Sequence, residues 1–142
     1  MTFILSLVAG EAELSDPAIT GQFAPEMAAL AKADQIVPWC GYIARREETI
    51  VGFGGFKGEP SEDGTVEIGY LTFPAHERCG VATEVAKGLI EIARNHGVRS
   101  VTAHTLPEEN ASTIVLRRND FERAGEIIDP DEGPVWRWER VL

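Results

Sequence analysis

The sequence has few cysteines, few basic residues and no long apolar run, and each shortage excludes a class of protein. The two cysteines among 142 residues, Cys40 and Cys79, show neither CxxC nor Cys/His spacing. We therefore expect free thiols in a reducing compartment and no metal site. Lysine and arginine number 13 against 23 aspartates and glutamates, a net charge of −10. This charge argues against partners such as nucleic acid or an anionic membrane surface. No segment approaches the roughly 18 apolar residues of a membrane span.

What remains is the composition of an ordinary folded domain. A hydrophobic content of 44% and a charged content of 25% exclude disorder, and the length fits one domain over residues 1–142. The opening segment MTFILSLVAGEAE has no basic stretch, and its apolar run breaks at Gly10 and Glu11, so no signal peptide is predicted. We expect a cytoplasmic domain.

The apolar pattern predicts alternating strands and helices. Short apolar or β-branched runs bounded by turn residues predict strands at 2–8, 39–46, 49–57, 65–73, 98–106, 121–128 and 135–141. Capping signals predict short helices from Asp16 and from Pro25 to Lys32, and another at 112–119. The clearest helix is 81–96, where apolar residues recur at a spacing of three and four before Gly97.

Two further patterns concern loops and close packing. Gly52, Gly54 and Gly55 lie within one predicted strand, which indicates a bulge or a close backbone approach. The acidic segment DPDEGP, at 129–134, is expected to be a solvated loop between the last two strands. The strand–helix–strand order in the middle of the chain predicts one parallel pair within a mostly antiparallel sheet, hence a mixed α/β fold.

The segment TVEIGYLTFPAHERCGVATEV, at 65–85, is the most informative for function. A strand ends, a short loop follows and a helix begins at once. Backbone N–H groups at the helix start form an anion site, because Gly80 allows close approach and Ala82 and Thr83 are small. Loops of this kind also occur in proteins that bind no anion.

Neighbouring motifs point to one family. With EIGY before the loop and PEENASTIVLRRNDFERAGE after the next strand, the chain resembles the GNAT acetyltransferase superfamily. Within it, the branch that includes the ribosomal-protein N-terminal acetyltransferases is most similar. The resemblance runs from Thr65 to Glu126, extends to 39–57, and is only positional before that. It implies a sheet with helices on both faces, whose parallel strands at 65–73 and 100–106 splay apart, and acetyl-CoA as co-substrate with an amine-bearing acceptor.

The resemblance also implies a set of cofactor-binding residues. The family's loop Gln/Arg-x-x-Gly-x-Gly/Ala, which holds pyrophosphate through its amides, matches 77–82 here. Backbone groups near the end of the preceding strand would bind pantetheine and polarise the thioester carbonyl. Together with the second motif, the expected residues are Leu71, Thr72, Phe73, Arg78, Cys79, Gly80, Val81, Ala82, Thr83, Asn110 and Ser112. Arg78 would contact phosphate or remain a solvated charge.

This sequence departs from the family pattern in three places. Glu77 puts an acid where the family has a base or an amide, which should weaken cofactor binding without abolishing it. The second motif has Glu109 at its asparagine position, and Asn110 one residue later either turns into the site or caps the helix. The 112–119 helix lacks the tyrosine that often protonates the leaving thiolate in the family.

Glu67 is our first candidate for the base, because a glutamate at this position serves so in some members of the family, often through water. His104, on the adjacent strand, could instead take the proton. Tyr70 lies on the opposite strand face from Glu67 and is expected in the core, as are the three tryptophans, Trp39, Trp136 and Trp138. His76 should be exposed, and Cys79 lacks a partner histidine for a nucleophilic role.

We therefore expect an N-acetyltransferase that acts by direct attack of the amine, with a protein N-terminus or a small molecule as acceptor. Phe23 and Met27 would line the acceptor pocket, since that region varies with substrate in the family. Two alternatives are kept: a degenerate family member that binds CoA or a partner without turnover, and an α/β domain without a CoA site. The oligomeric state is open, with a homodimer as one option.

Overall fold

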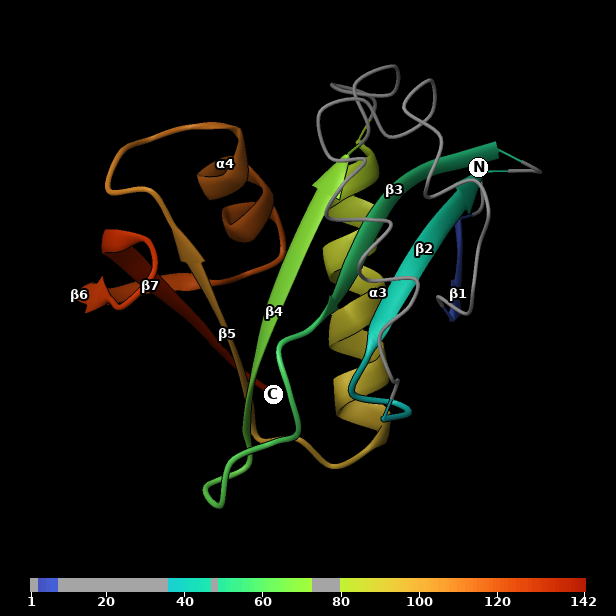
Figure 1. The fold of residues 1–142 in the computed structure, drawn as a ribbon, viewed down its shortest axis with the longest axis horizontal. Coiled ribbons are helices and arrows are strands. Elements are labelled where there is room, and N and C mark those ends of the chain that lie inside the picture. Colours follow the sequence, from blue (N-terminus) through green and yellow to red (C-terminus); the bar gives the residue numbers. More distant parts are fainter. Residues whose placement is uncertain (1–2, 8–35, 47–48, 73–79) are drawn as a thin grey trace.

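The predicted strands assemble into one mixed sheet (Figure 1). The structure is a computed structural model and describes residues 3–7, 36–46, 49–72 and 80–142. Within these residues the sheet has seven strands in the order β1-β2-β3-β4-β5-β7-β6. The strands are β1 (Phe3–Leu7), β2 (Gly41–Arg46), β3 (Thr49–Phe56), β4 (Thr65–Thr72), β5 (Ser100–Thr105), β6 (Glu122–Asp129) and β7 (Gly133–Val141). Among the described strands, β4 and β5 are the one pair that runs in parallel, as the strand–helix–strand order predicts.

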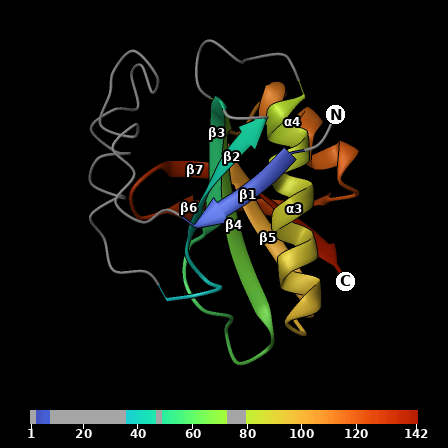
Figure 2. The same cartoon turned by 90° about the vertical axis from the view of Figure 1, so that its right-hand side faces the viewer.

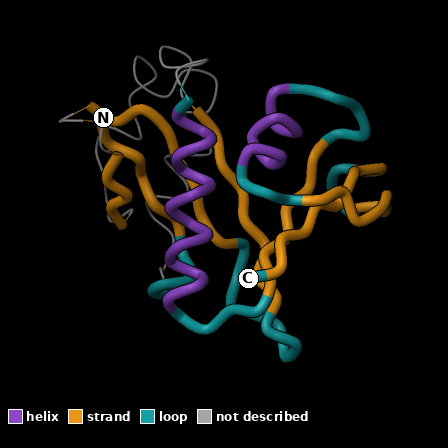
Figure 3. Tube along the Cα trace, turned by 180° about the vertical axis from the view of Figure 1, so that it is seen from behind, coloured by secondary structure: helices purple, strands orange, loops and turns teal. Residues whose placement is uncertain are grey.

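The described helices are α3 (Val81–Asn95) and α4 (Ala111–Arg118), which match the predicted helices at 81–96 and 112–119 within one residue. Both lie on the same side of the sheet, as Figure 2 shows, and Figure 3 shows α3 lying along the strands. The helices predicted at 16–32, and the pocket residues Phe23 and Met27, fall outside the described residues. No helix of the described segments has the length and apolar content needed to cross a membrane.

Helix α3 is the main support of the sheet. Its apolar stripe is buried against β3 and β4, through Val81, Val85, Ala86, Leu89, Ile90 and Ala93. Gly97 follows the C-cap His96, as predicted for a glycine that closes the helix, and its φ of 77° is left-handed. The N–H groups of Gly97 and Val98 donate to the carbonyls of Arg94 and Ala93, closing the helix with a Schellman motif.

The glycines of β3 allow α3 to approach closely. A Cβ at Gly54 would lie 2.3 Å from Val85 Cγ1, and one at Gly52 would lie 3.0 Å from Val81 Cγ1. The register of β2 and β3 also shifts between Ala44 and Arg45. Both features that the glycine pattern indicates, a bulge and a close approach, are therefore present.

The tryptophans pack as expected. Trp138 is fully buried, and its Nε1 donates to Thr105 Oγ1 at 2.9 Å. Trp39 and Trp136 are half-buried against the same core. One expectation at this end is wrong: the acidic segment is shorter than predicted, because β6 continues through Asp129 and β7 begins at Gly133.

Candidate active site

The parallel strands β4 and β5 separate partway along their length. Their paired positions are Thr65–Ser100, Val66–Val101 and Glu67–Thr102. Beyond Glu67, β4 stays paired with β3 up to Thr72, and β5 stays paired with β7 up to Thr105. The two strands therefore diverge, as Figure 1 shows, and from that point their facing backbone edges do not pair with each other. Such edges can hydrogen-bond an extended ligand.

Tyr70 bridges the divergence on the helix side. Its hydroxyl lies 3.0 Å from Ser112 Oγ and donates to the Ser112 carbonyl at 3.3 Å. Tyr70 is half-buried against the core, as predicted, and burial raises the pKa of its phenol to about 12. This contact of β4 with the first turn of α4 was not predicted, because nothing local in the sequence indicates it.

A charged cluster lies on the opposite face of the sheet, where β4 and β5 begin to separate. Val66 and Ile68 are buried in the helix-side core, so the alternation of β4 places Glu67 on the other face. Glu67 Oε2 lies 3.0 Å from Lys57 Nζ and 3.5 Å from His104 Nδ1. The two candidates for the base, Glu67 and His104, are therefore neighbours.

A fourth residue, Asp129, completes this cluster. Its Oδ2 lies 3.7 Å from His104 Nδ1, and its side chain is 22% exposed. The prediction that the whole acidic segment is solvated is therefore wrong for Asp129. The N–H groups of Asp131 and Glu132 donate to its Oδ1 at 2.8 and 3.1 Å, which holds the pKa of this carboxyl below its usual value. The signal that sequence reasoning passed over is an aspartate at the first position of a tight hairpin turn.

The start of α3 carries the cofactor-loop residues that the structure describes. Gly80 is the N-cap, with a left-handed φ of 78°, and as a glycine it has no side chain that could cap the helix start. Among the described residues, a Cβ at Gly80 would meet no atom within 4 Å. Val81 is buried and anchors the turn, while Ala82 and Thr83 are half-buried. The backbone N–H groups of a first helical turn can bind an anion.

Of the other residues expected to bind the cofactor at the end of β4 and in the loop, two are described by the structure and three are not. Leu71 and Thr72 are half-buried on β4, beyond the divergence. Phe73, Arg78 and Cys79, together with Glu77 and His76, lie outside the described residues.

Asn110 serves as the N-cap of α4, one of the two roles expected for it. Its side chain accepts from the Thr113 N–H at 3.1 Å, and Thr113 Oγ1 accepts from the Asn110 N–H at 3.1 Å. Glu109, at the family's asparagine position, accepts from Arg117 at 2.7 Å and from the Thr113 hydroxyl. The hydrogen bond from Arg117 is the main reason that the Glu109 pKa falls to about 2. Glu109 therefore stabilises the start of α4 through these hydrogen bonds.

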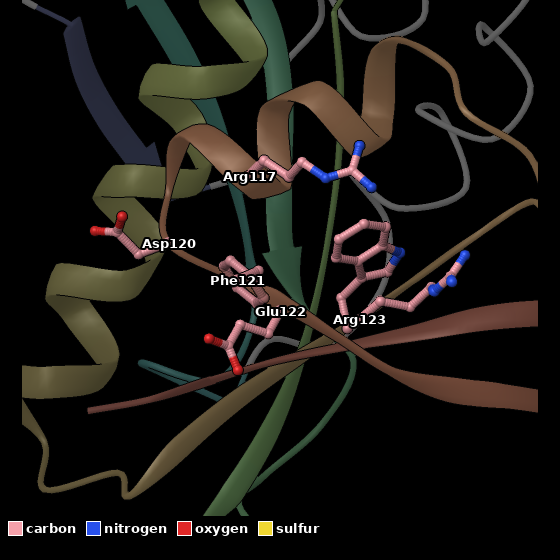
Figure 4. A pocket seen from close by; sticks show the side chains of 6 residues that line it. Arg117, Asp120, Phe121, Glu122 and Arg123 are labelled. Atoms are coloured by element: carbon pink, nitrogen blue, oxygen red, sulfur yellow. The ribbon is translucent and has the colours of Figure 1, made fainter.

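A separate open pocket lies between the end of α4 and strand β6 (Figure 4). Its arginines are already engaged. Arg117 pairs with Glu109 and lies 5.1 Å from the Trp138 ring, and Arg123 lies 4.2 Å from the Trp136 ring. Asp120 and Glu122 also line the pocket, so it does not suit a phosphate group.

Comparison with known proteins identifies the family. The model of the acetyltransferase (GNAT) domain matches residues 9–122. The chain therefore belongs to the GNAT acetyltransferase family, as the motifs predict. A Bacillus subtilis relative described as an uncharacterized N-acetyltransferase, YjdG, is 30% identical over 89 residues, which cover 63% of this chain and 51% of the relative. The match thus spans about half of that curated protein.

Solved structures share the fold. The ribosomal L7/L12 alpha-N-protein acetyltransferase RimL, in complex with coenzyme A, superposes with a TM-score of 0.65 at 18% identity, over 72% of this chain and 61% of that chain. The aminoglycoside acetyltransferase AAC(6')-Ib, also in complex with coenzyme A, gives 0.76 at 17% identity, over 99% and 95%. The similarity to a ribosomal-protein acetyltransferase is thus confirmed for the fold, which an aminoglycoside enzyme also shares.

Proposed function

We propose that the chain transfers an acetyl group from acetyl-CoA to an α-amino group, on a protein N-terminus or on a small molecule. The observation that carries this proposal is the divergence of β4 from β5, with Glu67 as the last residue of β4 that pairs with β5. The ionisable side chain of Glu67 thus lies where β4 and β5 cease to pair with each other. In a direct attack, the amine nitrogen bonds to the acetyl carbon, the C–S bond breaks, and CoA leaves as a thiolate that is then protonated.

The described residues suit the donor substrate. The start of α3 at Gly80 offers backbone N–H groups and the positive end of a helix dipole to the pyrophosphate. In this proposal Arg78, Cys79, Val81, Ala82 and Thr83 complete that turn. Backbone groups of Leu71 and Thr72 on β4, and of Phe73 after them in the sequence, would bind pantetheine and polarise the thioester carbonyl. Asn110 and Ser112, at the start of α4, would border the same space.

The amine must lose its proton before it attacks, and Glu67 is proposed to accept it, directly, through water, or by way of His104. The acceptor class follows from the strength of this base. An α-amine has a reference pKa near 7.7–8.0 and a lysine side chain one near 10.4, so deprotonating lysine at neutral pH costs roughly 3–4 kcal/mol more. A carboxylate that accepts the proton directly, through water or by way of one imidazole therefore suits an α-amine better.

The acceptors of structurally similar enzymes do not decide the matter. RimL is described as an alpha-N-protein acetyltransferase and AAC(6')-Ib as an aminoglycoside acetyltransferase, and their structures are 17–21% identical to this chain. The preference for an α-amine therefore rests on the base.

The test has two stages. Thermal denaturation with and without acetyl-CoA measures binding, and thiol release then measures turnover on three acceptors: a peptide with a free α-amine, an Nα-acetylated lysine peptide, and an aminoglycoside. We expect a thermal shift, and thiol release chiefly with the α-amine peptide. A shift without release from any amine would favour a family member that binds CoA without turnover. The absence of both would contradict a CoA site.

A further inference from the structure

The tip of the β6–β7 hairpin lies close to His104, one of the two candidates for the base. Strand β7 pairs with β5 only from Trp136 onward, so the hairpin continues beyond the last β5–β7 pair, Thr105–Trp136. This extension brings Asp129, which pairs with Gly133 across the turn, to within 3.7 Å of the His104 ring.

The two carboxylate oxygens of Asp129 make different contacts. Oδ1 accepts the N–H groups of Asp131 and Glu132, which fixes the orientation of the carboxylate. Oδ2 is the atom that lies toward His104 Nδ1. Because the backbone N–H bonds lower the pKa of Asp129, this carboxylate stays charged at neutral pH. The turn therefore presents a fixed negative charge to the ring.

His104 Nδ1 faces two carboxylates at similar distances. Glu67 Oε2 lies 3.5 Å away on one strand, and Asp129 Oδ2 lies 3.7 Å away on another. Nδ1 is buried and has no hydrogen-bond partner of good geometry among the described residues. Other charges near the ring are Lys57, beside Glu67, and Arg137, which pairs with His104 in the sheet register and bonds Glu139.

A proton on Nδ1 is attracted by both carboxylates, whereas a bare Nδ1 would place its lone pair against two negative charges. In the neutral ring, these charges favour the tautomer with the proton on Nδ1 and the lone pair on Nε2. A base oriented in this way by a carboxylate is a recurrent arrangement for proton transfer from a nucleophile.

We propose that Asp129 is a positioning residue: with Glu67 it holds the Nδ1 proton of His104, so that Nε2 is the atom that receives the proton of the acceptor amine. The amine proton moves to Nε2, the ring becomes an imidazolium between the two carboxylates, and the proton then passes to solvent. This inference rests on the proposed function, within which it names the proton-accepting atom.

The chain offers a matched control for the test. Asp129→Asn keeps a carbonyl oxygen for the two turn N–H groups but removes the charge beside His104. Asp131→Asn removes the same charge from the same turn, at an exposed residue. A difference between the two variants therefore reports the contact with His104, not net charge.

Two measurements are made on the parent and both variants. In steady-state kinetics with the α-amine peptide, we expect Asp129→Asn to lower kcat roughly 10- to 100-fold with an unchanged KM for acetyl-CoA, and to move the acidic limb of the pH–rate profile to lower pH. The control should match the parent. Nitrogen-15 NMR of the histidine rings, assigned with His104→Gln, should show the Nδ1–H form in the parent and a shift toward Nε2–H in Asp129→Asn.

The NMR result needs no turnover, so the inference can be tested even if the proposed function fails. A parent ring that carries its proton on Nε2 would overturn the inference. Identical kinetics in Asp129→Asn and Asp131→Asn would also overturn it, and would leave Glu67 as the base with the proposed function intact.

Discussion

A substitution in β3 tests how α3, and with it the proposed cofactor turn, is seated on the sheet. Replacing Gly54 with alanine adds a Cβ 2.3 Å from Val85 Cγ1 and 3.0 Å from Leu89 Cδ1. Ordinary contact begins near 3.4 Å, so Val85 must retreat by about 1 Å. Both contacts are on fully buried helix residues, which have little room to move.

Overpacking of a core in this way costs about 1–3 kcal/mol. For a chain of this size that corresponds to a fall in Tm of roughly 3–9 °C. Differential scanning fluorimetry or calorimetry measures it. Because Val85 follows Gly80 by little more than one turn, the shift produced by acetyl-CoA should also shrink.

Gly69→Ala is the matched control. It adds the same methyl group to the neighbouring strand, where the nearest atom is Lys57 Cε at an ordinary 3.4 Å. We expect its stability to remain within about 0.5 kcal/mol of the parent. If Gly54→Ala were as stable as Gly69→Ala, the close packing of α3 on β3 would be refuted.

Three other predictions concern the site and its surroundings. Glu67→Gln should lower turnover roughly 10²–10⁴-fold, which is the usual contribution of a positioned base. The affinity for acetyl-CoA should be almost unchanged, and the loss of turnover should shrink as pH rises. An unchanged pH–rate profile would remove Glu67 from the mechanism. Gly80→Asp should abolish the thermal shift that acetyl-CoA produces. Gly80→Asn should retain part of this shift, because asparagine tolerates the same left-handed φ and carries no charge. Equal acetyl-CoA binding by Gly80→Asp and the parent would disprove the loop assignment. The pKa values of Tyr42 and Tyr70 are raised to about 12, mainly by burial, so both phenols stay neutral in the folded state while the unfolded chain ionises near pH 10. The stability that the two phenols contribute should be fully present below about pH 10 and be lost as pH rises toward 12. If the phenolate absorbance of the folded protein reached half its full value near pH 10, that result would contradict the burial.

Much of the fold is predictable because the relevant signals are local. The apolar stripe of α3 and the glycine after it fix the helix and its end within one residue. The alternation of β4 correctly separates Glu67 from Tyr70. Asn110 followed by Thr113 forms a reciprocal cap, a local pattern that could have decided the role of the asparagine.

The contacts of the site are not predictable in the same way. The approach of His104 to Glu67 depends on the parallel register that sets Glu67 opposite Thr102, which no turn specifies. The position of Asp129 depends on how far the last hairpin extends beyond β5. Both are properties of strands distant in sequence, so composition and spacing carry no trace of them.

The most direct test of the account is a competition within one acceptor. A peptide with a free α-amine and an internal lysine is incubated with the protein and acetyl-CoA, and the acetylated position is found by fragmentation mass spectrometry alongside thiol release. We expect thiol release matched by acetylation of the α-amine, with lysine left largely unmodified. Acetyl-CoA binding without acetylation of either amine, or acetylation confined to lysine, would contradict the account.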